Sequence, residues 1–261
     1  MAKGKIRKAA LEKLYRRYNR RQYVHPDPLE FLYRYPAARD REIVALLAAS
    51  LAYGRVSQIL RSVQAVLDRL GKSPHDFVKH TSRKELAATF AGFRHRFTSA
   101  AGIVSLLEGT RRALSKYGSL NECFLRGFHS PDATVLPALE KFVAELGCRD
   151  RFLLPVPGNG SACKRLNLFL RWMVRKDAVD PGGWHGVPKS KLIVPLDTHM
   201  AQIGRTWRLT KRASPNMKMA LDITRFFGKL APKDPVRSDF ALTRFGIRPE
   251  LDPAMLPVLR H

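Results

Sequence analysis

The stretch that decides the fold reads Pro157-Gly158-Asn159-Gly160-Ser161-Ala162-Cys163-Lys164. It is a glycine-rich turn that leads directly into a segment whose apolar residues recur at helical spacing. Residues 134–147 show a similar pattern, so the region predicts a helix, a tight turn and a second helix over 161–175. Backbone N–H groups at the start of that second helix point outward, where they can bind a phosphate. The alternative is an ordinary helix–helix connection with Ser161 as the N-cap.

A second informative stretch lies downstream and reads Val194-Pro195-Leu196-Asp197-Thr198-His199-Met200. Asp197 follows a proline and stands where the N-cap of the next helix is expected. The interval from Lys164 leaves room for one helix and a long loop, so two helices packed side by side can bring Lys164 and Asp197 to one crevice. An amine nucleophile and a carboxylate are then candidates for one site. Each residue also has a simpler role, Lys164 as a surface phosphate contact and Asp197 as a cap.

Basic residues far outnumber acidic residues in this chain of 261 residues. Lysine and arginine total 47 against 22 for aspartate and glutamate, which gives a formal net charge of +25 and a pI of about 10.7. A charge of this size predicts a polyanionic partner. The apolar fraction of 45% favours a packed globular protein over a disordered basic tail. We therefore expect one compact unit over residues 1–261.

Cysteine and histidine give no sign of a metal centre. The three cysteines, Cys123, Cys148 and Cys163, are widely spaced, and no two of the eight histidines stand at the spacing of metal ligands. We expect reduced thiols, no metal and no cofactor. No apolar run approaches the roughly 20 residues that cross a bilayer, so we also expect a protein that does not contact membranes.

Helical patterns run along the whole chain. Residues 6–18 predict a basic amphipathic helix, and residues 39–70 predict a longer helical segment that Gly54 interrupts. The predicted helix starts are Ser82, Ser119, Ser214 with Pro215, and Asp234 with Pro235, and the predicted helix ends are Gly71, Gly118 and Gly147. Strand signals are nearly absent, so the predicted fold class is all-α.

These motifs carry a resemblance to a known group of enzymes. The glycine-rich turn, Lys164 just beyond it and the later Asp197 motif together resemble the helix-hairpin-helix DNA glycosylase superfamily. Within it, the long interval between lysine and aspartate is similar to that of the 8-oxoguanine glycosylases, including the archaeal GO glycosylase type. The resemblance covers roughly residues 43–246. In the hairpin, Asn159 stands where the superfamily has an apolar residue, which weakens the expected phosphate contact. The whole chain also resembles a bacterial family of this size whose function is not established.

The resemblance implies a fold, an activity and a partner. The fold would be two-lobed, with a DNA cleft between one lobe of residues 40–176 and another that combines residues 1–39 and 190–261. The activity would be that of a bifunctional DNA glycosylase and abasic-site (AP) lyase, with 8-oxoguanine as the leading substrate base. Lys164 would attack the sugar and form a Schiff base, while Asp197 would stabilise the oxocarbenium-like transition state. The partner would be double-stranded DNA with a damaged base, bound by a monomer at the nucleoid in the bacterial cytoplasm.

The resemblance also suggests which residues contact DNA. The hairpin and the residues after it would bind phosphate, and His199 would contact the phosphate of the target nucleotide. Where the base has flipped out, Tyr53 would stack and Arg55 would reach the orphaned partner base. A helix kink with Tyr53 in the core, and a core position for His199, are the alternatives. The expected DNA-binding residues are therefore Gly158, Asn159, Gly160, Ser161, Arg165, His199, Tyr53 and Arg55. The candidate residues of the base pocket are Asp239, Trp172 and Trp184.

Two other functions stay open from the sequence. The first is a catalytically silent protein that binds DNA or RNA with the same fold and charge. The second is a metal-dependent nuclease that uses acidic residues near the N-terminus, namely Asp27, Glu30, Asp40 and Glu42. Neighbouring arginines argue against the nuclease, because they favour solvated ion pairs with these acids.

Overall fold

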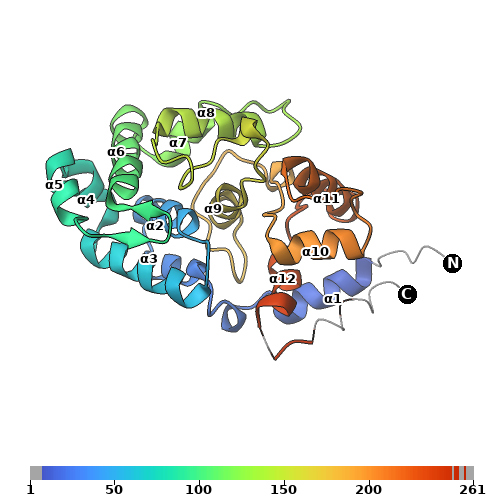
Figure 1. Cartoon of the computed structure of the whole chain (residues 1–261). Helices are drawn as coiled ribbons and strands as arrows, with labels where there is room; N and C mark the ends of the chain where they lie inside the picture. The colour runs from blue at the N-terminus through green and yellow to red at the C-terminus, as the bar shows by residue number, and fades with distance from the viewer. Residues whose placement is uncertain (1–7, 249, 253–255, 257–261) are drawn as a thin grey trace.

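The computed structural model describes residues 8–248, 250–252 and 256, and this part of the chain is predominantly helical (Figure 1). It confirms the all-α prediction. The α-helices are α1 (Lys8–Tyr18), α2 (Ala38–Ser50), α3 (Val56–Leu70), α4 (Pro74–His80), α5 (Arg83–Thr89), α6 (Ala100–Tyr117), α7 (Leu120–Leu125), α8 (Leu136–Leu146), α9 (Lys164–Val174), α10 (Thr198–Thr206), α11 (Met217–Leu230) and α12 (Asp239–Ile247). Short 3-10 helices lie at η1 (Arg21–Tyr23), η2 (Pro28–Arg34), η3 (Pro157–Asn159) and η4 (Lys189–Lys191). Strands β1 (Arg94–His95) and β2 (Thr98–Ser99) form a small antiparallel hairpin in which Arg94 lies opposite Ser99.

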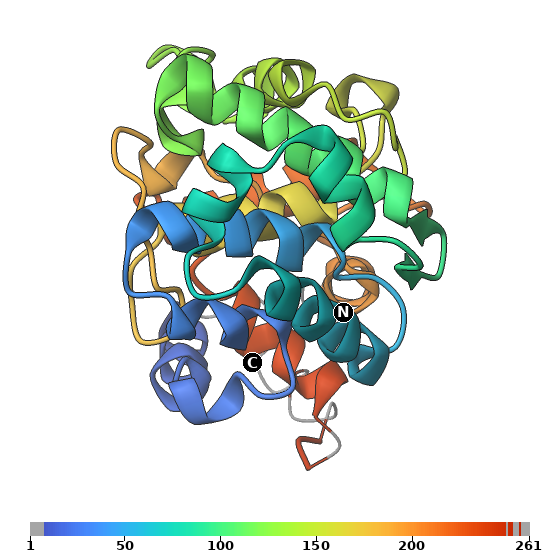
Figure 2. The same cartoon turned by 90° about the vertical axis from the view of Figure 1, so that its left-hand side faces the viewer.

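Helix α9 lies at the centre of the molecule and joins its two sides. It packs against α2, while α6, α7 and α8 pack together beyond α2. On the other side α1 packs against α12, which in turn packs against α10. Figure 2 shows α6 along the top of the molecule and α1 and α12 at the bottom. The N-terminal segment contacts both sides, because η2 packs against α2 whereas α1 packs against α12.

Local sequence signals account for many of the helix boundaries. Helices α3, α6 and α8 end at Gly71, Gly118 and Gly147, each at positive φ, as the sequence predicts. Ser82 and Glu85 form a reciprocal capping box at the start of α5. Gly54, with φ of 94°, lies in the connection between α2 and α3. This connection forms part of the rim of the cavity described below.

Three predicted helix starts are wrong. Helix α9 begins at Lys164 and not at Ser161, because Cys163 takes a left-handed conformation with φ of 46° and holds the chain out of the helix before it. Helix α11 begins after Asn216, whose side chain accepts from Met219 N at 2.9 Å, so the cap is Asn216 instead of Ser214. Helix α12 begins at Asp239, since the Asp234 carboxylate binds Arg175 and does not cap a helix.

None of the helices in the described ranges combines the length and the apolar character needed to cross a membrane. Residues 6 and 7 of the predicted N-terminal helix lie outside the described residues, and α1 covers the remainder of that prediction.

Candidate active site at the start of helices α9 and α10

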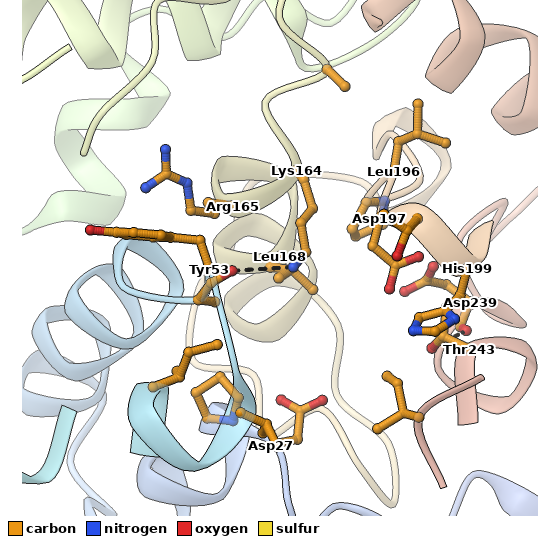
Figure 3. A pocket seen from close by; sticks show the side chains of 18 of the residues that line it. Asp27, Tyr53, Lys164, Arg165, Leu168, Leu196, Asp197, His199, Asp239 and Thr243 are labelled. Carbon is orange, nitrogen blue, oxygen red and sulfur yellow. Dashed lines mark hydrogen bonds between the residues drawn. The ribbon is translucent and has the colours of Figure 1, made fainter. Parts of the chain in front are cut away.

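A cavity of about 800 Å³ opens between α9, α10, α12 and the connection from α2 to α3. Helix α9 presents Lys164, Leu168 and Arg171 to it, which stand at the i, i+4 and i+7 positions of one helix face. Asp197 and His199 enter from the start of α10, and Asp239 from the start of α12 (Figure 3). The N-termini of α9, α10 and α12 therefore meet at the cavity, and each carries partial positive charge.

Lys164 is the first residue of α9, and its side chain is half-buried. Its Nζ donates a hydrogen bond to the carbonyl oxygen of Ala52 at 3.2 Å. Burial lowers the pKa of the Lys164 amine below its ordinary value, and the carboxylates of Asp197 and Asp27 only partly oppose this shift. A larger fraction of the amine is therefore neutral at pH 7 than for an exposed lysine, and the hydrogen bond to Ala52 leaves the nitrogen lone pair available.

Asp197 faces Lys164 across the cavity (Figure 3). It is the N-cap of α10, as predicted, and its Oδ1 accepts from Met200 N at 2.7 Å. The cap fixes the carboxylate at a helix N-terminus, where a negative charge is favoured. The sequence-predicted amine and carboxylate thus line the same cavity.

Behind these two residues the cavity wall carries a buried acid. Asp239 is 3% exposed and pairs with Arg171 Nη1 through its Oδ2. Burial raises the pKa of Asp239 to about 6, although Arg171 favours the charged form. The other oxygen, Oδ1, is buried and has no hydrogen-bond partner among the described residues. Asp239, predicted from the sequence to lie in a base pocket, does line the cavity.

A second ion pair, missed by the sequence analysis, completes this wall. Asp27 caps η2 by accepting from Leu29 N and binds Arg244 Nη2 at 3.0 Å. Arg244 is 2% exposed, and its Nε and Nη1 have no hydrogen-bond partner in the described part of the chain. Arg171 continues the charged cluster inward, where its Nε lies 3.2 Å from Asp180. Two residues that line the cavity, Arg244 and Asp239, therefore carry buried polar atoms without a partner in the described part of the chain.

His199 lies between α10 and α12. A Cβ at Gly246 would stand 2.0 Å from His199 Nδ1, so the glycine is required for the imidazole to fit against α12. The ring is partly exposed and lines the cavity. His199 is therefore a cavity residue and not a core histidine.

The two tryptophans predicted for the base pocket lie elsewhere. Trp172 is fully buried, and Trp184 is 9% exposed and donates from Nε1 to Glu42 at 2.8 Å. Trp184 packs against the rings of Phe124 and Phe169. Both tryptophans belong to the core, and neither lines the cavity. The base-pocket assignment of these two residues is wrong.

The expected DNA contacts near the cavity rim are only partly available. Tyr53 lines the cavity, but Figure 3 shows its ring directed away from the Lys164 amine. Arg165 also turns away, and its guanidinium donates to the carbonyls of Ser50, at 2.7 Å, and Phe152. Arg165 therefore connects α9 to α2 through hydrogen bonds within the protein. This role differs from the phosphate contact expected from the sequence. Arg55 is exposed beside the cavity and is free of such internal bonds in the described structure.

The glycine-rich turn is exposed at the surface. Gly158, Asn159 and Gly160 are all exposed, and Gly160 has φ of 78°. Ser161 lines the cavity and its Oγ accepts from Cys163 N at 3.2 Å. The first backbone bond of α9 joins Asn167 N to the Cys163 carbonyl, so the amides of residues 164–166 have no partner within the helix.

The acids considered for a metal-dependent nuclease are dispersed. Asp27 binds Arg244, Asp40 accepts from His75 N at 2.9 Å, and Glu42 accepts from Leu120 N at 2.9 Å. Within residues 8–248, 250–252 and 256, no three histidine, cysteine or acidic side chains are grouped to hold a metal ion. The three cysteines are free and buried.

The fold and the cavity define a predominantly helical protein in which a half-buried lysine and a fixed carboxylate stand at the starts of α9 and α10. The chain belongs to a protein family described as "Protein of unknown function (DUF2400)", whose family model matches residues 27–248. This range includes every cavity residue discussed above. Neither the curated proteins nor the solved structures contain a match to the chain.

Proposed function

We propose that this protein is a bifunctional DNA glycosylase and AP lyase, in which Lys164 is the nucleophile and Asp197 stabilises the transition state. The observation that carries the proposal is that Lys164 and Asp197 line the same cavity, and burial there lowers the pKa of the Lys164 amine. A neutral amine beside a carboxylate is the arrangement that amine-based glycosidic cleavage requires. The net charge of +25 supplies the attraction to a DNA backbone.

The reaction begins when the Nζ lone pair forms a bond to C1′ of the deoxyribose. The N-glycosidic bond breaks, and its electron pair leaves with the base, which takes up a proton. The sugar ring then opens to an imine between Nζ and C1′. Loss of a proton from C2′ expels the 3′ phosphate and cuts the strand, and water finally hydrolyses the imine and restores Lys164.

Asp197 acts on the charge that develops at the sugar. As the glycosidic bond stretches, C1′ and the ring oxygen acquire positive charge, and a fixed anion lowers the energy of that state. Its N-cap bond to Met200 holds the carboxylate in place before the reaction starts, so little reorganisation is needed.

The wall formed by Asp239 and Arg244 is suited to an extruded base. Arg244 has two buried nitrogens without partners, and Asp239 has one buried oxygen without a partner. A base edge with an acceptor and a donor, such as that of 8-oxoguanine, would accept from Arg244 and donate to Asp239. It would thus supply hydrogen bonds that these two residues lack within the protein. An oxidised purine is therefore our leading substrate.

The proposal includes the two-lobed helix-hairpin-helix fold. It is supported by the succession of α8, the turn at Pro157–Gly160 and α9, and by the position of the cavity between the α2–α3 side and the α10–α12 side. In this arrangement residues 40–176 would form one lobe, and the described parts of residues 1–39 and 190–261 would form the other.

The direct test is borohydride trapping on a panel of duplexes that carry 8-oxoguanine, other damaged bases or an abasic site. A covalent adduct between protein and DNA supports the lyase, because protein and sugar stay joined only when borohydride reduces an imine between them to an amine. Binding without an adduct on every duplex would contradict the enzyme and favour the catalytically silent nucleic-acid-binding protein.

Binding to undamaged duplex is expected to weaken steeply with salt. If about 6 to 10 phosphates are contacted, affinity should fall roughly 10³- to 10⁵-fold between 50 and 200 mM salt, because counterions are released on binding. Fluorescence anisotropy across this range measures the slope. A slope near zero would show that the charge is not gathered on a DNA-facing surface and would remove the electrostatic support for the proposal.

The rate of trapping on an abasic duplex is expected to rise with pH and to level off below the ordinary lysine pKa of about 10.4. Only the neutral amine attacks, and burial lowers the pKa of Lys164 in the folded protein. Single-turnover rates between pH 6 and 11 locate the inflection. In Asp197→Asn the inflection should move to lower pH, because the carboxylate of Asp197 raises the pKa of Lys164. An inflection at or above 10.4 in the wild type would show an ordinary exposed lysine.

A further inference from the structure

The large apolar side chains that the described residues expose either line the cavity or are joined by ring contacts to its lining residue Tyr53. Three such side chains are exposed, Val56 at 37%, Phe97 at 69% and Phe152 at 43%. Val56 lines the cavity itself. Phe152 contacts the ring of Tyr53, and Phe97 contacts Phe152 with ring centroids 5.1 Å apart. Single exposed apolar side chains are common on protein surfaces, but a cluster of them beside a cavity indicates a binding surface.

Phe97 lies at the tip of the β1–β2 hairpin, and the base of this hairpin is firmly held. The hydroxyl of Tyr53 lies 2.7 Å from both the His95 carbonyl and the Thr98 hydroxyl. His95 is fully buried and its ring nitrogens bond Ser62 and the Tyr53 carbonyl. Burial lowers the pKa of His95, so the imidazole stays neutral at pH 7. The hairpin therefore presents Phe97 from a fixed base.

The turn of the hairpin also fixes Phe97 against the cavity rim. Arg96 has φ of 50°, a left-handed conformation that costs a non-glycine residue free energy. Its side chain covers Gly54, where a Cβ would stand 2.7 Å from Arg96 Cδ. Gly54 lines the cavity. The strained turn is thus packed onto the rim, while the neighbouring Phe97 ring is left in solvent, as expected of a feature that serves binding.

The surroundings of the two rings are cationic. Exposed arginines stand within three residues before each ring in sequence, Arg94 and Arg96 before Phe97 and Arg149 and Arg151 before Phe152. The Arg96 guanidinium lies 5.5 Å from the centroid of the Phe97 ring. The nearby Asp150 is turned inward and accepts from the amides of Phe152 and Leu153. Aromatic faces between arginines are the combination that binds unpaired bases, because the rings stack on the base while the cations bind phosphates.

We infer that Phe97, supported by Phe152, stacks on an unpaired base of DNA at the mouth of the cavity. When the target nucleotide turns into the cavity, the Phe97 ring occupies the gap or covers the orphaned base, and Arg94 binds the adjacent backbone. The inference rests on the proposed function for the identity of the partner. It assigns to Phe97 the stacking role that the sequence suggested for Tyr53, whose hydroxyl and ring are used to hold the hairpin.

The experiment compares affinity for two duplexes of one sequence, one intact and one with a tetrahydrofuran abasic analogue. The wild type should prefer the abasic duplex. Phe97→Ala should reduce this preference about fivefold or more, the effect of losing one base-stacking ring, and Phe97→Trp should retain it. Arg94→Ala is the matched control on the same hairpin and should weaken both duplexes equally. The melting temperature of the Phe97 variants should not change, because the ring is 69% exposed.

Three results would overturn the inference: no preference by the wild type, an equal loss on both duplexes in Phe97→Ala, or self-association in solution that depends on Phe97. The last would make the surface an interface between copies of this chain. Tetrahydrofuran cannot form an imine, so this binding assay does not depend on Lys164. If trapping fails but Phe97→Ala still reduces the preference for the abasic duplex, only the lyase is contradicted. If trapping succeeds but Phe97→Ala has no such effect, only the stacking surface is contradicted.

Discussion

Lys164→Ala should abolish the adduct that borohydride traps while affinity for duplex DNA changes little. The imine requires the Nζ amine, and no other group can replace it in the covalent step. One cation among 47 basic residues contributes little to the electrostatic binding of DNA. The fold should persist, because Lys164 is half-buried and its Nζ donates to a single carbonyl, that of Ala52. Trapping on an abasic duplex, with anisotropy on the same duplex, measures the two effects separately.

The matched control is Lys218→Ala. Lys218 is an exposed lysine on α11 that does not line the cavity, so its loss removes the same charge and should leave trapping intact. Full trapping by Lys164→Ala would place the nucleophile elsewhere. Loss of trapping in both variants would point to weakened binding and not to chemistry.

The residues that sequence analysis located well are those governed by local signals. Asp197 was predicted as an N-cap from its position after Pro195, and it caps α10 in the structure. The interval between Lys164 and Asp197 allowed the two to share a crevice, and both line one cavity. A cap, a proline and a glycine act within a few residues, so their effects can be read from the chain alone.

The ion pairs of the cavity wall could not be found in this way. Asp27 and Arg244 are separated by 217 residues, and Arg171 and Asp239 by 68, so neither pair leaves a local signal. Arg171 alone had one available signal, since it stands seven residues after Lys164 on the same helix face. Such pairs form only when the tertiary fold removes the charges from water, and then each needs its partner.

The tryptophans were assigned to the base pocket although they lie in the core. Trp172 and Trp184 were considered because an aromatic ring can stack on a base, but burial of so large an apolar surface favours the core unless another feature exposes it. Phe97 was overlooked because a short hairpin in a helical chain leaves little pattern. Its exposure depends on the turn at Arg96 and on the hydrogen bonds of Tyr53, which only the folded structure brings together.

Asp197→Asn should lower the rate of base release by about two orders of magnitude or more while the protein stays folded. Asparagine caps a helix about as well as aspartate, so the cost in stability should be about 1 kcal/mol or less. The substitution removes the negative charge that stabilises the oxocarbenium-like transition state, and loss of one such preorganised electrostatic group typically costs about 10²- to 10³-fold in rate. Single-turnover base release from a lesion duplex and thermal unfolding measure the two effects.

An abasic duplex separates the roles of the two residues, because there the base has already left. Asp197→Asn should therefore trap on this duplex nearly as well as the wild type, whereas Lys164→Ala should not trap at all. Asp68→Asn is the control, because this substitution removes the same charge from an exposed residue of α3 that does not line the cavity. If Asp197→Asn unfolds, Asp197 is chiefly structural. If the variant releases the base at the wild-type rate, the carboxylate does not stabilise the transition state and the proposed division of labour is wrong.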